Sequence, residues 1–276
     1  MKKRFHRLGL YVVLILLLSS LAAGCAPQAP NPTVPTGEST SDPTKATTPT
    51  QATEQIATQP TEAVCTEPTA PPVHDPYPQY VLTDVQETIE GSDQHWNQWK
   101  IPIRIPKIVP FSDDAVTCQQ EIQNIFTSKV AEIRDYSGQG FHPLTASIGF
   151  DTYLNGDILS LVIQEATNID INLYWVYNFD VKSGKRLDTD ALMQKLGIKD
   201  YAQRITQTAK DKFEELWPPN PAHDSVLYKQ QAEATISQEN IDAAQPFLAQ
   251  DGQLTVAIYI YSLAGASRYT YTLPVA

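Results

Sequence analysis

The sequence has few of the residues that build metal, redox and nucleotide sites. Its 276 residues include three cysteines and five histidines, with no C-x-x-C and no H-x3-H pair. Zinc sites and dithiol redox sites rely on such spacings. The phosphate loop G-x-x-x-x-G-K-[ST] and the nucleophile elbow G-x-S-x-G are also missing. The sequence therefore predicts no metal, no cofactor and no catalytic residue.

Basic residues are scarce as well. Lysine and arginine number 20 against 31 acidic residues, for a net charge of −11. Removing residues 1–24 takes away four basic residues and no acidic one, so the charge becomes −15. Nucleic-acid binding needs clustered lysine and arginine, so no nucleic-acid partner is expected. An acidic surface instead favours a cationic partner.

The only long apolar run lies at the N-terminus. A basic head precedes the apolar residues 8–18, and small residues lead to Cys25, as in a secretory signal. The run is shorter than the roughly 20 residues that span a bilayer. Ala22-Ala23-Gly24-Cys25 resembles the lipobox of bacterial lipoproteins, in which the cysteine is acylated. We therefore predict a lipid anchor at Cys25 on the outer face of the cytoplasmic membrane; the alternative is an ordinary signal cut near Ala23.

A spacer is predicted between this anchor and the rest of the chain. Residues 25–75 are rich in threonine and proline and poor in large apolar side chains. Such a segment cannot bury enough surface to offset its ordering entropy, so we expect a disordered, extended tether. Cys65 lies in this tether and Cys118 in a predicted helix. Either the two form a disulfide, which the compartment allows, or Cys118 is a small buried thiol.

Residues 76–276 have globular composition and the length of one domain. Ser112 or Asp113 would cap a helix whose apolar positions, from Val116 to Ile133, recur every three or four residues. Alternating strands flank Asn155-Gly156, the strongest short hairpin signal. Further helices are expected over 189–196, 201–216 and part of 226–244, and further strands over 171–181, 185–187, 246–250, 253–263 and 268–274. Hairpins with helices inserted between them predict an α+β fold, an antiparallel sheet with helices packed on it.

The stretch LYWVYNFDVKSGKRL, residues 173–187, has two interpretations. Asp180 with Ser183-Gly184-Lys185 would be either a chemical site with a phosphate cradle, or a strand, a tight turn and the next strand. The glycine feeds a turn and a strand, whereas a phosphate loop feeds a helix. The structural interpretation is therefore favoured.

Three stretches carry a family resemblance: NGDILSLVIQ, YNFDVKSGKRLDTDALM and FLAQDGQLTVAIYIYSLAGASRYTYTLP. They resemble an extracytoplasmic domain of largely unknown function from Gram-positive bacteria, over roughly Pro102 to Pro274. That domain occurs beside polysaccharide deacetylases and in the outer part of anti-sigma factors that sense lysozyme. The stretch from Tyr261 to Arg268 departs from the family, since it lacks the family's glutamate and proline. If that stretch forms a ligand surface, the departure implies a different ligand.

Together these features predict a non-catalytic module that binds or senses an envelope component. Peptidoglycan, or a cationic protein such as lysozyme, would be its partner beside the membrane. Candidate ligand-binding residues are the tyrosines Tyr259, Tyr261, Tyr269 and Tyr271, whose rings would stack on a glycan; alternatively they pack across strands or beneath a helix.

Two other functions stay open. One is a structural or chaperone-like lipoprotein of the envelope. The other is a glycan-acting enzyme, which needs paired carboxylates. The acidic residues on or near the hairpins are Asp151, Asp157, Glu165, Asp170 and Asp180.

Overall fold

The domain predicted over residues 76–276, called the head below, begins with a long β-hairpin followed by the longest described helix. We analysed a computed structural model that describes residues 75–92, 97–169, 171–220, 225–264 and 268–275. These residues all belong to one compact unit, residues 67–276. The predicted signal peptide, the predicted lipidation site Cys25 and residues 26–74 of the predicted tether lie outside the described residues. The first elements are β1 (Val81–Ser92), β2 (Gln98–Ile108) and α2 (Asp113–Gly138).

Helix α2 starts where the sequence predicts. The side chain of Ser112 accepts a hydrogen bond from the backbone N–H of Ala115 and so caps the first turn. The face that packs on the sheet consists of Ala115, Cys118, Ile122, Phe126, Val130 and Ile133. Val116 was wrongly predicted on this face, because the stripe passes through its neighbour Ala115 and leaves Val116 exposed.

Cys118 is a buried thiol, and burial raises its pKa to about 11. It lies in the core between α2 and the sheet. Its alternative disulfide partner, Cys65, lies outside the described residues, so the pairing itself stays a prediction.

Six strands form a large sheet in the order β1-β2-β3-β4-β5-β6. Its remaining strands are β3 (Thr145–Asn155), β4 (Ile158–Thr167), β5 (Leu173–Asp180) and β6 (Lys185–Leu187). The hairpin predicted at Asn155-Gly156 is confirmed, with Gly156 at a φ of 59°. All neighbours pair antiparallel except β2 and β3, which run parallel and meet at Ile103 and Ile148.

A second, smaller sheet of order β7-β8-β9 was not separated from the first by sequence. The elements after β6 are α3 (Thr189–Leu196), α4 (Tyr201–Leu216), α5 (Ser225–Thr235), α6 (Gln238–Ala243), β7 (Gln245–Leu248), β8 (Leu254–Tyr261) and β9 (Arg268–Pro274). These helices and strands match the predicted ones, and the fold is α+β, rich in antiparallel strands. Among the described residues, no helix has the length and apolarity needed to cross a membrane.

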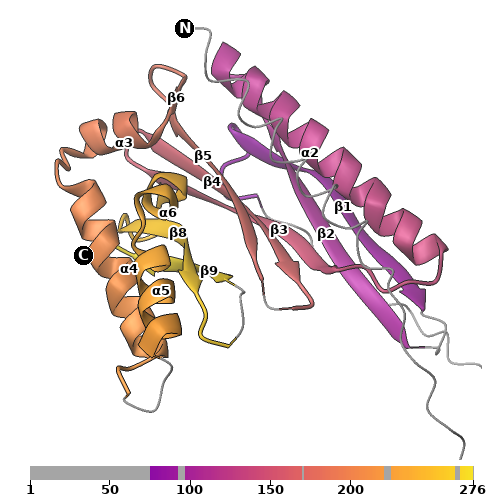
Figure 1. Cartoon of the computed structure of the whole chain (residues 1–276). Helices are drawn as coiled ribbons and strands as arrows, with labels where there is room; N and C mark the ends of the chain where they lie inside the picture. Colours follow the sequence, from indigo (N-terminus) through magenta and orange to yellow (C-terminus); the bar gives the residue numbers. More distant parts are fainter. Residues whose placement is uncertain (1–74, 93–96, 170, 221–224, 265–267, 276) are drawn as a thin grey trace, which may run out of the picture. The chain divides into compact units, whose positions relative to one another are not determined.

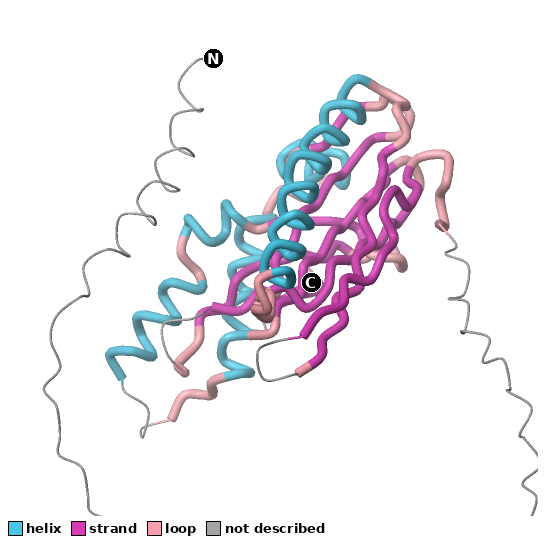
Figure 2. Tube along the Cα trace, turned by 90° about the vertical axis from the view of Figure 1, so that its right-hand side faces the viewer, coloured by secondary structure: helices cyan, strands magenta, loops and turns pink. Residues whose placement is uncertain are grey.

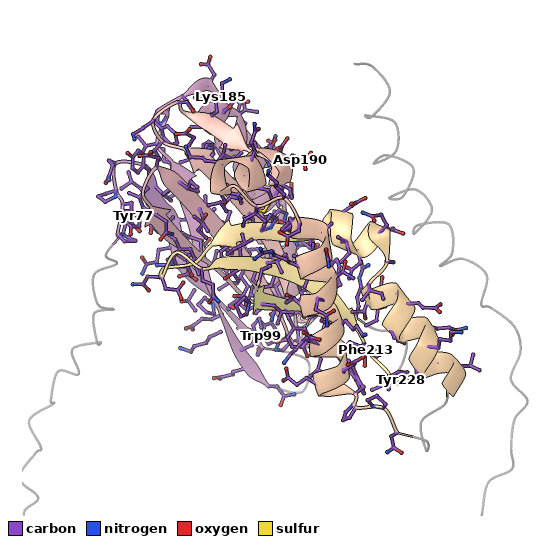
Figure 3. The ribbon with its side chains drawn as sticks, turned by 90° about the vertical axis from the view of Figure 1, so that its left-hand side faces the viewer. Tyr77, Trp99, Lys185, Asp190, Phe213 and Tyr228 are labelled. Atoms are coloured by element: carbon purple, nitrogen blue, oxygen red, sulfur yellow. The ribbon has the colours of Figure 1, made fainter. Side chains whose placement is uncertain are left out.

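The two sheets divide the head into two apolar cores. Helix α2 lies along one face of the large sheet and encloses the first core with it (Figures 1 and 2). The second core lies between the small sheet and the helices α3 to α6. In that core Phe213 of α4 and Tyr228 of α5 meet edge to face, with ring centroids 5.3 Å apart (Figure 3).

Buried polar groups join the two sheets. Asn178 of β5 donates to the carbonyl oxygen of Pro246 in β7 at 2.8 Å. Ser160 of β4 donates to Asn178 Oδ1 at 2.7 Å and accepts from the Leu248 N–H at 3.1 Å. All these bonds are buried, so they satisfy polar groups that water does not reach. They fix β7 against the face of the large sheet opposite α2.

Gly184, in the turn between β5 and β6, is held against the start of α2. Its φ is 71°, and a Cβ added there would lie 2.6 Å from Ser112 Cβ. The Ser112 hydroxyl also donates to the Gly184 carbonyl. Gly197 has the same φ of 71°, but a Cβ there would meet nothing within 4 Å. A comparison of substitutions at the two positions therefore separates the cost of a left-handed backbone from the cost of steric overlap.

We expect Gly184→Ala to destabilise the head more than Gly197→Ala. Both substitutions pay about 1–2 kcal/mol for a left-handed backbone with a side chain, and Gly184→Ala adds about 1–3 kcal/mol for overpacking. Urea unfolding of the two variants measures the difference. Equal losses would contradict the close packing of this turn on Ser112.

Candidate functional site

A hollow lies against the first core, beside the C-terminal half of α2. It is a pocket of about 470 Å³ between that helix, the loop before β3 and the end of β4. Its lining residues are Lys129, Glu132, Ile133, Tyr136, His142, Pro143, Leu144, Thr145, Glu165, Thr167, Asn168 and Leu173. A mainly apolar hollow with a few converging polar groups is the usual form of a binding site.

An ion pair forms the floor of this pocket. Glu165 of β4 lies 2.5 Å from Lys129 of α2, measured from Oε2 to Nζ, and only 6% of its side chain is exposed. Thr145 donates to Glu165 Oε1 at 2.6 Å. The Lys129 ammonium also lies 5.4 Å from the centre of the Trp175 ring, where a cation is attracted by the ring face. Breaking such a pair leaves a buried charge, so both side chains are held in place.

The loop before β3 is tied to the turn between β4 and β5. Asn168 donates to the carbonyl oxygen of Pro143 at 2.7 Å, and its Nδ2 lies 3.0 Å from His142 Nδ1. The His142 ring also packs on Trp99, with centroids 4.9 Å apart. One wall of the pocket is therefore held by contacts to strand β2 and to the turn that follows β4.

Exposed apolar side chains line the pocket or lie next to its lining residues in sequence. They are Tyr136, Phe141, Leu144 and Ile169, which are 45%, 50%, 57% and 53% exposed. Tyr136 and Leu144 line the pocket itself, and the other two are sequence neighbours of its lining residues His142 and Asn168. These four residues are called the apolar rim below, and several exposed apolar residues near one hollow are typical of an interaction site.

The sequence carried only part of the signal for this site. Glu165 was noted as an acidic hairpin residue, but its partner Lys129 was missed. Along β4, Glu165 takes the same face as Leu159, Leu161 and Ile163, which are buried under α2. A carboxylate on the same strand face as three buried apolar residues needs a partner. That alternation in the sequence could have predicted a buried, paired Glu165.

Glu165 and Asp180, two of the carboxylates that the sequence offered for a glycosidase pair, lie far apart. Glu165 pairs with Leu173, and Asp180 with Ile158, so they lie seven residues apart along the sheet. At about 3.3 Å per residue that is more than 20 Å, far beyond the roughly 5–10 Å that glycoside hydrolysis uses. Asp151 takes the sheet face opposite Glu165, Asp157 pairs with Lys182 at 2.7 Å, and Asp170 lies outside the described residues.

Asp180 organises a turn, as the structural interpretation predicts. Its Oδ1 accepts from the backbone N–H groups of Lys182 and Ser183, and its Oδ2 lies 2.9 Å from Lys195 Nζ. The hydrogen bond from Lys195, with the two backbone bonds, lowers the pKa of Asp180 from 3.8 to about 2. A depressed carboxyl pKa stabilises the fold above the unfolded pKa, and that contribution is lost as the pH falls towards 2.

We therefore expect Asp180→Asn to lower stability at pH 7 and to have little effect near pH 2. Asparagine keeps an acceptor for the two backbone N–H groups but removes the charge that faces Lys195. Urea midpoints from pH 7 to pH 2 test this, with Lys195→Met as the matched variant that should reproduce the loss at pH 7. A loss of equal size at both pH values would show that the turn geometry, and not the charge, is responsible.

The four candidate tyrosines lie on opposite faces of the small sheet. Tyr269 and Tyr271 stand opposite Ile260 and Ile258 in the β8–β9 register, on the face that belongs to the second core. Lys212 of α4 lies 5.3 Å from the centre of the Tyr271 ring.

Tyr259 and Tyr261 take the other face of that sheet. The Arg268 guanidinium lies 3.9 Å from the centre of the Tyr259 ring and donates to Tyr261 Oη at 3.4 Å. The four rings therefore do not form one stacking surface, and ligand contact by any single one stays a prediction.

No group of three or more metal-ligating side chains occurs within the described part of the chain. No family model matches the sequence, and no curated protein matches it. Among solved structures, a DUF3298 family member from Bacteroides fragilis matches at 13% identity and a TM-score of 0.35, covering 71% of this chain and 89% of that one. A DUF3298 protein from Pseudomonas aeruginosa matches at 12% identity and a TM-score of 0.35, covering 71% and 90%. Likenesses this distant carry no argument about function.

Proposed function

We propose that this chain is a lipid-anchored protein of the bacterial surface, and that its α+β head is a non-catalytic binding module. The order of basic, apolar and small residues before Cys25 supports the anchor. The Thr/Pro-rich segment that follows would act as the tether.

The observation that carries the binding role is the pocket beside α2 with its apolar rim. Isolated exposed apolar residues are normal, but four around one hollow are a docking feature. The ligand we propose is an envelope component such as peptidoglycan, or a cationic protein such as lysozyme. The net charge of −11 supports the second of these.

Calorimetry on the chain from residue 26 onward, which lacks the signal and Cys25, tests the binding role. Lysozyme and purified peptidoglycan are titrated separately at two salt concentrations. Micromolar or tighter binding to lysozyme that persists at moderate salt supports a sensing or sequestering role. Binding to peptidoglycan alone supports wall adhesion. No heat with either ligand would contradict both and favour a structural or chaperone-like lipoprotein.

The anchor is tested on the whole chain in a bacterial host. We expect Cys25→Ser to move the protein from the membrane fraction to the medium or wall fraction, because the acyl chains supply the membrane affinity. An unchanged membrane fraction would contradict lipidation at Cys25.

A further inference from the structure

We propose that the pocket beside α2 is the contact point for a cationic polypeptide. The partner places one apolar side chain in the pocket and a neighbouring basic side chain against Glu132. This inference rests on the proposed binding function and assigns its site and the chemistry of its ligand.

The shape and lining of the pocket favour an apolar side chain as the part of the partner that enters. Ile133, Pro143 and Leu173 line its walls. Tyr136 and Leu144 of the apolar rim also line it, and both are exposed. Burying the rim against a partner removes large apolar side chains from water. An apolar anchor in a preformed pocket is also the usual form of an interface hot spot. The wall needs little rearrangement, because Asn168 already holds the His142 loop.

The polar groups of the floor are already matched to one another. Lys129 and Glu165 pair at 2.5 Å, and Thr145 occupies the other oxygen of Glu165. An anionic ligand would have to draw Lys129 away from a carboxylate that is almost fully buried. That loss would leave the Glu165 charge unpaired and is expensive. The floor therefore disfavours an anionic ligand.

The charge at the mouth favours a cation. Glu132 lines the pocket from the exposed side of α2, and its neighbour Lys129 is already engaged with Glu165. The pocket also lies beside the C-terminal end of α2, a helix of 26 residues with no basic residue in its last turn. The partial negative charge of a helix C-terminus attracts cations. Glu132 and the helix end thus act in the same direction.

The test uses the chain from residue 26 onward and two probes. One probe is lysozyme, and the other is a short synthetic peptide with a single leucine flanked by lysines, compared with its glutamate counterpart. The variants are Leu144→Ser on the apolar rim and Glu132→Gln at the mouth. Their matched controls are Val116→Ser, exposed near the start of the same helix, and Glu233→Gln on α5. Binding is measured by fluorescence anisotropy at low and moderate salt.

We expect Leu144→Ser to weaken binding of the lysine peptide by about tenfold, which converts to about 1.4 kcal/mol. Glu132→Gln should weaken it by about threefold at low salt, and less at moderate salt because exposed charges are screened. The two control variants should bind the lysine peptide as tightly as wild type. The glutamate peptide should bind wild type more weakly than the lysine peptide does.

The outcomes distinguish a failure of the proposed site from a failure of the proposed function. If lysozyme binds and Leu144→Ser and Glu132→Gln bind it as well as wild type, the site is wrong and the binding function stands. Peptide binding that depends on Leu144, without lysozyme binding, supports the site and removes lysozyme as the ligand. If wild type binds neither probe, this inference is overturned, and the peptidoglycan titration alone decides the proposed function.

Discussion

Replacing Lys129 with methionine is expected to destabilise the head by about 2–3 kcal/mol. Methionine keeps an apolar chain of similar length against Trp175 but removes the ammonium that faces Glu165. The Glu165 side chain is 6% exposed, so its charge would be left in the interior with only the Thr145 hydroxyl as a partner. Removing one member of a buried pair typically costs about 3–5 kcal/mol. Because the Lys129 side chain is 24% exposed, we expect a loss of stability at or below the lower end of that range.

The matched control is Lys182→Met. Lys182 and Asp157 pair at 2.7 Å, but the lysine side chain is 76% exposed, and exposed pairs contribute about 0–1 kcal/mol. The double variant Lys129→Met with Glu165→Gln should recover part of the loss, because no unpaired charge then stays buried. Urea unfolding of wild type, Lys129→Met, Glu165→Gln and the double variant completes the cycle, and Lys182→Met is measured beside them. If Lys129→Met costs no more than Lys182→Met, the pocket floor is not a buried pair.

Replacing Asn178 with alanine is expected to cost about 2–4 kcal/mol and to loosen the small sheet from the large one. The substitution leaves the Pro246 carbonyl oxygen without its donor and the Ser160 hydroxyl without its acceptor, both in the interior. An unsatisfied buried polar group costs about 1–3 kcal/mol, and the missing amide also leaves a small cavity.

Asn155→Ala serves as the control for this prediction. Asn155 makes the same kind of bond, from its Nδ2 to the Ala249 carbonyl oxygen at 2.9 Å, but it is half-exposed, so water can replace the lost donor. We expect its loss to be about 1 kcal/mol or less. Hydrogen exchange at the Leu248 amide, which donates to Ser160, should quicken only in Asn178→Ala. Unchanged exchange there would contradict the role of Asn178 in joining the sheets.

Local signals predicted the elements that depend on neighbours in sequence. The Ser112 cap, the Asn155-Gly156 hairpin and the end of α3 at Gly197 occur as expected, since caps and tight turns are decided within a few residues. The hairpin of β1 and β2 was missed. Pro102 and Pro106 lie within β2, and proline in a strand lacks the N–H of the ladder. They fit here because β2 meets β3 at a single register pair.

The candidate site depends on contacts that no local pattern reports. Lys129, His142 and Glu165 come from a helix, a loop and a strand, and they meet only because α2 crosses the end of β4. Alternation along β8 correctly separated Tyr259 and Tyr261 from the apolar face. It could not place Tyr269 and Tyr271, because the pairing register of β9 on β8 decides which of its residues face the helices.

By itself, the sequence determined the α+β class, the position of most helices and hairpins, and the structural role of the Asp180 turn. Each of these follows from periodicity, caps or turn residues within about a dozen positions. Only the tertiary structure decided that the strands form two sheets, that Asn178 and Ser160 bond them together, and that the pocket forms beside α2. These features join residues up to 88 positions apart, and they depend on how whole faces pack. That packing is a property of the assembled head, since each face is buried only by the element that covers it.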